Sequence, residues 1–248
     1  MIQLNELSML FRNKPQLALL SEIITEMLSP AYRREDPFTV SIYGMGHGGC
    51  EATSLRITLR EMGIPDDQVE ILSSDHSAYL IDLWYSREYS IDHMVDRAGN
   101  NLVPEEIMQK YFYLDENTWR LTDETIATSI LLQVSFVQFE DSQSDIVMFQ
   151  NATPFILDEV TCESVIKGAV EKTRGGGYVL LGGYDKHRTK ALAKLLSRGI
   201  ITPCMKDAKA IHDGWLDRRS GIPEVVEAGF DLGEYISDPL YCSIFRKV

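Results

Sequence analysis

The sequence lacks the features that mark a secreted, membrane-spanning or metal-binding protein. Its four cysteines are scattered along 248 residues without a Cys-x-x-Cys spacing, so neither a disulfide framework nor a metal site is expected. There is no apolar run of roughly 18 residues, and no basic region followed by an apolar stretch opens the chain. We therefore expect a cytoplasmic protein with no membrane segment.

Positive charge is also scarce. The chain has 24 Lys and Arg residues against 37 Asp and Glu, a net charge of −13, and nowhere do four basic residues follow one another. Because this field repels a phosphate backbone, nucleic-acid binding is not expected. The motif GxxxxGK[ST] is missing as well, which disfavours a nucleoside triphosphate as ligand.

What the chain does contain is an alternation of apolar, β-branched runs with amphipathic segments. Strands are predicted at residues 38–43, 69–72, 131–136, 145–149 and, after a glycine triplet, 178–181. Helices are predicted at residues 14–29, 50–62, 77–85, 104–110, 158–172 and 188–197. This order is typical of an α/β protein with a mostly parallel sheet and helices on both faces.

Two regions depart from the alternation. Residues 111–130 mix aromatic with polar side chains and indicate an irregular hairpin. Towards the end of the chain, the predicted elements are helices at 205–218 and 222–228 and an antiparallel hairpin of residues 230–236 and 240–245. We divide the chain into an amino-terminal helical flap, residues 1–36, and one α/β domain, residues 37–248.

A glycine-rich turn, residues 44–49, connects the first predicted strand to the next helix. Glycine lets the backbone approach a ligand closely, and ligands of open α/β sheets lie at the carboxyl ends of the strands. Gly44, Gly46 and Gly49 match the GxGxxG pattern, which alone is a weak signal for a dinucleotide. The alternative is a tight turn that needs glycine for its geometry only.

Two acidic residues favour a different ligand. Asp75, at the end of the next predicted strand, can accept hydrogen bonds from ribose hydroxyls, or it caps the helix that begins near Ser77. Glu51, in the first turn after the glycines, would repel a pyrophosphate and suits an ammonium group; alternatively, the helix dipole alone favours it there. Adenosine, ribose and an α-amino acid together describe S-adenosylmethionine.

Six short segments, in order along the chain, carry a resemblance to a known family. They are Asn5 to Arg12, Gly48 to Ser54, Ser73 to Ser77, Gln109 to Phe112, Asp145 to Asn151 and Gly176 to Gly183. They are similar to motifs of the CheR-type protein-glutamate methyltransferases, which methylate chemoreceptor carboxylates with S-adenosylmethionine. The resemblance implies a class I methyltransferase-like, Rossmann-like fold with this cofactor.

The resemblance also implies roles for single residues. Arg12 would reach the methyl-transfer region, where a guanidinium can hold a substrate carboxylate in a bidentate pair. Gln150 and Asn151, at the end of the fourth strand, would face the cofactor. Independently of the family, Glu140 or Asp141 after the third strand would accept a hydrogen bond from the adenine amine.

Some positions differ from the family, and they change the expected substrate. Gln150 replaces an Arg, Phe155 stands where a Tyr is usual, and few residues precede Arg12, so we expect the receptor-docking domain to be absent. We expect a small-molecule or peptide acceptor that is methylated on an oxygen, with a carboxylate as the expected acceptor group. Arg12, Asn151 and Tyr184 are the expected catalytic residues, the Tyr184 hydroxyl orienting the acceptor.

Two other functions stay open. The α-amine of S-adenosylmethionine can in principle attack its own γ-carbon, giving azetidine-2-carboxylate and methylthioadenosine. An aromatic, desolvated pocket would favour the neutral amine that this reaction needs, whereas a nearby Glu51 would oppose it. The chain can also be a non-catalytic module that binds S-adenosylmethionine. The sequence predicts no oligomeric state.

Overall fold

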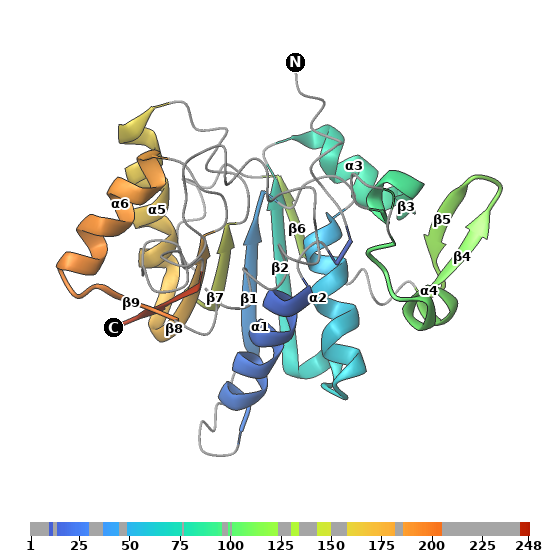
Figure 1. Cartoon of the computed structure of the whole chain (residues 1–248), viewed down its shortest axis with the longest axis horizontal. Coiled ribbons are helices and arrows are strands. Elements are labelled where there is room, and N and C mark those ends of the chain that lie inside the picture. The colour runs from blue at the N-terminus through green and yellow to red at the C-terminus, as the bar shows by residue number, and fades with distance from the viewer. Residues whose placement is uncertain are drawn as a thin grey trace.

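The structure is a computed structural model that describes most of the chain. The described residues are 10–11, 14–29, 37–44, 49–75, 77–95, 99, 101–123, 130–133, 143–149, 158–181, 186–204 and 244–248. Within them, a seven-stranded main sheet and a three-stranded small sheet lie on opposite sides of helix α2 (Cys50–Glu61) (Figure 1).

The elements follow the predicted alternation. The strands of the main sheet are β1 (Phe38–Tyr43), β2 (Val69–Asp75), β6 (Ile130–Gln133), β7 (Ser144–Phe149), β8 (Thr173–Leu181), β9 (Ile201–Pro203) and β10 (Ile244–Lys247). The small sheet consists of β3 (Glu88–Tyr89), β4 (Phe112–Asp115) and β5 (Thr118–Leu121). The other helices are α1 (Lys14–Met27), α3 (Ala78–Ser86), α4 (Glu105–Tyr111), α5 (Glu159–Lys172) and α6 (Lys186–Ser197). The six helices predicted up to residue 197 are thus confirmed.

The main sheet is mostly parallel, as predicted. Its strand order is β6-β2-β1-β7-β8-β10-β9, and the first five strands are parallel neighbours. β10 runs antiparallel to both β8 and β9. Numbered along the chain, the order is 3-2-1-4-5-7-6, which is the dinucleotide-binding order 3-2-1-4-5-6 with a reversed strand inserted. This is a Rossmann-like sheet of the class I methyltransferase-like kind.

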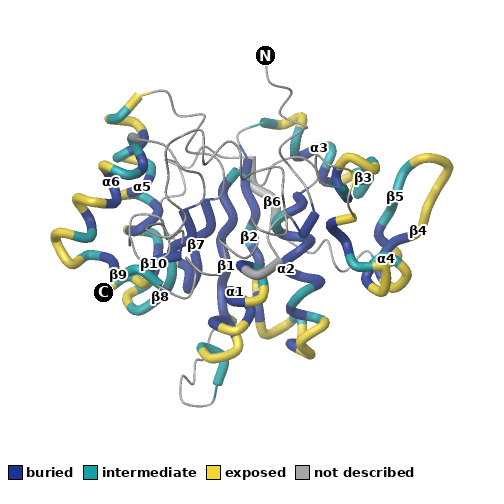
Figure 2. The backbone as a smooth tube through the Cα atoms, in the orientation of Figure 1, coloured by how far each residue is buried: buried dark blue, intermediate teal, exposed yellow. Residues whose placement is uncertain are grey.

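Helices cover both faces of the main sheet. Side chains alternate along β7, so that Ile146 and Met148 face one cluster and Val147 and Phe149 face the other. The first cluster contains residues of α1, α2 and α3, and the second contains residues of α5 and α6. The central strands β1 and β7 are buried along their whole length (Figure 2), as expected for parallel strands covered on both sides.

Helix α1 contributes to the first of these clusters. Leu19, Leu20, Ile23 and Ile24 of this helix are buried there. The division of the chain at residue 36 into a flap and a domain stays a prediction.

A smaller unit follows α3. Helix α4 and the antiparallel strands β3, β5 and β4 form it, and we call residues 88–121 the small-sheet unit. Its β4–β5 hairpin confirms the hairpin predicted within residues 111–130. Tyr89, Phe112 and Leu121 pack with Ile57 on the side of α2 that faces away from the main sheet. Eight of the twelve residues of α2 are therefore buried.

The structure corrects two predicted strand boundaries. β2 continues to Asp75 instead of ending at residue 72, because it pairs with β1 on one side and with β6 on the other. β8 starts at Thr173 and includes the glycine triplet that was expected to precede it. The β7–β8 register shifts there, and a Cβ on Gly177 would lie only 2.4 Å from the Asp145 carbonyl oxygen. Glycine therefore permits a bulge rather than breaking the strand.

The end of the chain also differs from the prediction. The described part of the predicted strand 240–245 lies in β10, and β8 and β9 occupy both edges of β10. Residues 240–243 lie outside the described residues. Residues 230–236, the expected partner of this strand, also lie outside the described residues, as do the predicted helices at 205–218 and 222–228. The sequence does not predict β9, because a three-residue strand that ends in proline carries little strand signal.

Candidate functional site

The glycine-rich turn lies where the parallel strands end. β1 ends at Tyr43, and Gly44 follows with a φ of 66°, a left-handed conformation that favours glycine. The Gly44 amide donates to the Ser74 carbonyl oxygen at 2.9 Å. This bond holds Gly44, the first residue of the turn, beside the end of β2, where Asp75 is the last residue.

Gly49, at the other end of the turn, is required by geometry on two counts. Its φ is 63°, and it forms the N-cap of α2. A Cβ at this position would lie 2.0 Å from Cε3 of Trp84, whose side chain is buried in the core. For Gly49, the structure therefore supports the alternative that glycine serves the geometry of the turn.

Glu51 stands in the first turn of α2 and is half-buried. Its Oε2 atom is fully buried. Burial, and then the charge of Glu51, raise the pKa of the neighbouring Cys50 thiol well above its usual value, so Cys50 is a neutral, buried thiol. A partly desolvated carboxylate beside the glycine turn can hold a cationic group more strongly than an exposed one can.

Asp75 is buried at the end of β2 and is already engaged in a local turn. Its Oδ1 accepts a hydrogen bond from the Ser77 amide at 2.9 Å. Ser77 itself caps α3, because its hydroxyl accepts from the Leu80 amide. The cap is thus Ser77, not Asp75, which corrects the alternative drawn from the sequence. The Ser77 amide occupies one of the roughly four acceptor positions of a carboxylate.

Two buried polar groups close to this edge were not predicted from the sequence as site residues. Tyr43 is the last residue of β1, and burial raises the pKa of its phenol to about 12, so it is neutral at physiological pH. The hydroxyl of Ser73 on β2 is buried and has no hydrogen-bond partner among the described residues. Neither a tyrosine at a strand end nor a serine inside a strand is a signal that sequence analysis can use.

Arg188 is a third residue that the sequence did not single out. It is completely buried near the start of α6, and its Nε donates to the carbonyl oxygen of Leu181 at 3.0 Å. Leu181 is the last residue of β8, so this bond joins α6 to the carboxyl edge of the sheet. Only its burial distinguishes Arg188 from other arginines on amphipathic helices.

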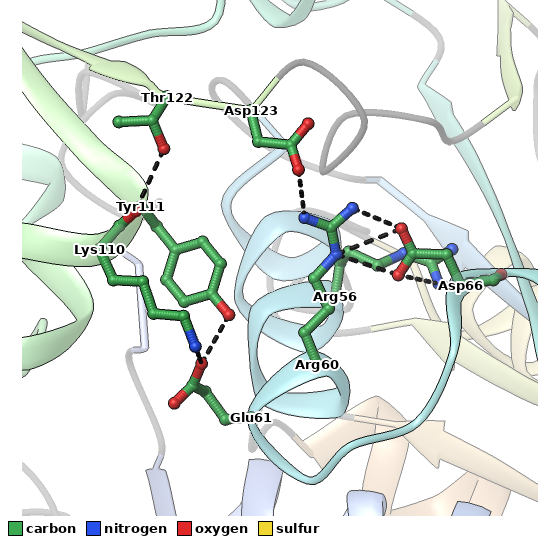
Figure 3. Close-up of polar contacts among 8 residues, drawn as sticks. All are labelled: Arg56, Arg60, Glu61, Asp66, Lys110, Tyr111, Thr122 and Asp123. Atoms are coloured by element: carbon green, nitrogen blue, oxygen red, sulfur yellow. Dashed lines mark hydrogen bonds and ion pairs between the residues drawn. The ribbon is translucent and has the colours of Figure 1, made fainter.

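The far end of α2 is held by charged contacts on both sides (Figure 3). Arg60 pairs with Asp66, in the turn before β2, and with Asp123, which follows β5, at 2.7 Å. Glu61 accepts from Lys110 at 2.6 Å and from the Tyr111 hydroxyl at 2.5 Å. These contacts connect the helix that carries Glu51 to both neighbouring units.

The structure thus places Gly44 beside the end of β2, where Asp75 is the last residue, and Glu51 in the first turn of α2. The other predicted site residues lie outside the described residues: Arg12, Gly46, Glu140, Asp141, Gln150, Asn151 and Tyr184. Among the residues that are described, no group of three His, Cys, Asp or Glu side chains could hold a metal ion. No helix in this part of the chain is long and apolar enough to cross a membrane.

Comparisons with known proteins give remote matches of structure only. No family model and no curated protein sequence matches the chain. A precorrin-6y C5,15-methyltransferase from Geobacter metallireducens GS-15 shares 12% identity at a TM-score of 0.39, over 74% of this chain and 72% of its own. The sugar N-methyltransferase KedS8 from Streptoalloteichus sp. shares 11% at 0.38, over 69% and 49%. CalS10, an amino pentose methyltransferase from Micromonospora echinaspora, shares 10% at 0.36, over 68% and 52%.

The chain spans about half the length of the two sugar methyltransferases. With TM-scores below 0.5, these neighbours carry no information about the substrate of this chain. Its fold is assigned from its own strand order, and its function has to be inferred from its own residues.

Proposed function

We propose that the chain binds S-adenosylmethionine at the carboxyl edge of β1 and β2 and transfers the methyl group to an oxygen of a small molecule or peptide, in the simplest case a carboxylate oxygen. One observation carries this proposal. The Gly44 amide bonds to the carbonyl of Ser74, the neighbour of Asp75, at 2.9 Å, and Glu51 is the second residue of the helix that follows the glycine-rich segment.

The three residues suit the three parts of this cofactor. Asp75 would accept hydrogen bonds from the ribose hydroxyls, and Glu51 would pair with the α-ammonium group. Gly44, which has no side chain, leaves room for the ligand to approach the backbone. Outside the described residues, Glu140 or Asp141 and Gln150 would complete the adenine and cofactor contacts.

Methyl transfer to a carboxylate needs little acid–base chemistry. When bound, S-adenosylmethionine supplies an activated methyl group on a sulfonium, and a carboxylate acceptor is already ionised at neutral pH. Tyr43, with a pKa of about 12, is no base at that pH. Catalysis would therefore rest on in-line positioning, for which Arg12, Asn151 and Tyr184 are the proposed residues.

Calorimetric titration with two ligands tests the cofactor site. We expect S-adenosylmethionine to bind, Asp75→Asn to weaken binding about tenfold, or about 1.4 kcal/mol, and Glu51→Gln to do the same. Methylthioadenosine lacks the amino acid, so Glu51→Gln should leave its affinity unchanged while Asp75→Asn still lowers it. The exposed Glu70 on β2 and Asp82 on α3 provide the matched controls Glu70→Gln and Asp82→Asn. Absence of binding by the wild-type protein would refute the site.

Product analysis tests the reaction. With a panel of carboxylic acids and a glutamate-containing peptide, we expect S-adenosylhomocysteine to form only when an acceptor is present. Arg12→Ala should then lower turnover far more than cofactor affinity. Methylthioadenosine formed from S-adenosylmethionine alone, above the spontaneous background, would indicate the intramolecular cyclisation instead. Binding without any product would indicate a non-catalytic module.

A further inference from the structure

The segment Leu10–Phe11, which we call the amino-terminal hook, is fixed to the first turn of α2. Both side chains are buried in the cluster that α2 shares with the small-sheet unit. The Phe11 amide donates to Oγ of Ser54 at 2.9 Å, and the Leu10 amide donates to the His93 carbonyl at 2.7 Å. The hook therefore bridges two elements that are distant in sequence.

The backbone of the hook is strained. Phe11 has a φ of 52°, a left-handed conformation that is rare for a bulky residue without a special reason. Such a conformation persists only where surrounding contacts hold it, and it is found at functional sites more often than elsewhere. Here the contacts that hold it are the bond to Ser54 and the burial of the phenyl ring.

Ser54 connects the hook to the proposed ligand site. Its hydroxyl accepts from the Phe11 amide and donates to the Cys50 carbonyl at 2.6 Å. Cys50 and Glu51 are the first two residues of α2, immediately after the glycine turn. The Ser54 hydroxyl therefore joins the hook to the helical turn that carries Glu51. If a ligand shifts or orders this turn, the hook must respond, and by linkage the docking of the hook must change the affinity for the ligand.

We propose that Ser54 is a positioning residue that couples docking of the amino-terminal hook to ligand binding at the first turn of α2. The inference rests on the proposed binding of S-adenosylmethionine. Arg12, a proposed catalytic residue, follows the hook directly in the sequence.

Ser54→Ala tests this role, with Thr58→Ala as the matched control. Thr58 lies one turn further along α2, and its hydroxyl donates to the Ser54 carbonyl at 2.7 Å, so both variants remove one hydroxyl bonded within the same helix. Release of the peptide 1–12 by trypsin, followed by intact mass, reports undocking of the hook. In Ser54→Ala, we expect the peptide to be released about tenfold faster and the affinity for S-adenosylhomocysteine to be about tenfold lower than in the wild type. In Thr58→Ala, both quantities should stay within about twofold of wild type.

The outcomes separate this inference from the proposed function. If the wild-type protein binds no S-adenosylhomocysteine, the proposed function fails and the coupling fails with it. If it binds, but Ser54→Ala matches Thr58→Ala in affinity, the coupling alone is wrong. If Ser54→Ala does not fold, hydrogen exchange of the Phe11 amide in the wild-type protein decides. We expect it to slow at least about tenfold on saturation with S-adenosylhomocysteine, and an unchanged rate would overturn the coupling.

Discussion

Helix α2 has two neighbours of different construction. Towards the main sheet it buries aliphatic side chains such as Leu55 and Leu59 against β1 and β2. Towards the small-sheet unit it meets aromatic and polar groups, among them Tyr89, whose hydroxyl lies 2.8 Å from Oγ1 of Thr53. Burial of aliphatic groups is non-directional, whereas hydrogen bonds fix geometry. Along the middle of α2, the main sheet therefore contributes mainly apolar packing, and the small-sheet unit adds a directional hydroxyl contact between Tyr89 and Thr53.

The largest effect is expected at the contact between the glycine turn and the main-sheet side. Gly49→Ala would place a Cβ 2.0 Å from Trp84 and force alanine into a left-handed conformation. The conformational term costs about 1–2 kcal/mol and overpacking about 1–3 kcal/mol more. We expect the free energy of unfolding, measured in urea, to fall by about 2–5 kcal/mol.

Gly63 provides the control for this variant. Its φ is 76°, but nothing lies within 4 Å of a Cβ built there, so Gly63→Ala carries only the conformational term of about 1–2 kcal/mol. Equal losses in the two variants would show that Trp84 does not constrain the turn.

Truncation on each side of α2 compares the two neighbours directly. Leu55 and Ile57 are both completely buried, the first against the main sheet and the second against the small-sheet unit. Each change to alanine should cost about 2–4 kcal/mol. By hydrogen exchange, we expect Leu55→Ala to destabilise every strand, and Ile57→Ala to release β4 and β5 before β1 and β7. Uniform exchange in Ile57→Ala would mean that the small-sheet unit is no separate cooperative unit.

The same contrast explains what the sequence could predict. β1 and α2 follow from apolar periodicity and a glycine turn, and Asp75 could be singled out because it ends a strand. The contacts on the small-sheet side of α2 were harder to predict from the sequence. β3 has two residues, and Arg60 meets Asp123 across 63 positions of sequence, a distance over which local patterns carry no information.

Within the site, residues whose roles depend on packing could not be predicted. From the sequence, Trp84 is an ordinary apolar residue of a helix, and only the structure shows that its ring packs against Gly49. The left-handed Phe11 has no sequence signature, because the contacts that hold it come from α2 and from residue 93. Candidate binding residues at strand ends can thus be predicted from the sequence, but the contacts with other elements that hold them in place cannot.

The hydroxyl pair between α2 and β3 should have a moderate effect. Tyr89 is fully buried, and burial raises the pKa of its phenol far above the usual value. Tyr89→Phe and Thr53→Val each leave one hydroxyl without its partner, at a cost of about 1–2 kcal/mol. In a double-variant cycle of unfolding free energies, we expect a coupling of about 1 kcal/mol. If the losses of the two single variants simply add up in the double variant, the Tyr89–Thr53 pair does not help to orient α2.

The smallest effect is expected at Arg60, where both neighbours meet. The hydrogen bonds from Arg60 lower the pKa of Asp66 below its usual value. A depressed folded-state pKa stabilises the protein above the unfolded pKa of about 3.9, and this stabilisation is lost as the pH falls through the folded value. Because Asp66 is one-third exposed, we expect Asp66→Asn to cost only about 1 kcal/mol at pH 7.

The pH dependence separates this ion pair from a general charge effect. The stability difference between wild type and Asp66→Asn should shrink below about pH 4, because Asp66 becomes protonated and neutral like asparagine. Asp67, exposed in the same turn, gives the control Asp67→Asn, which removes one negative charge from that turn without removing the partner of Arg60. A difference that persists undiminished at about pH 2.5, or an equal loss in Asp67→Asn, would mean that the Arg60–Asp66 pair does not stabilise the end of α2 where its two neighbours meet.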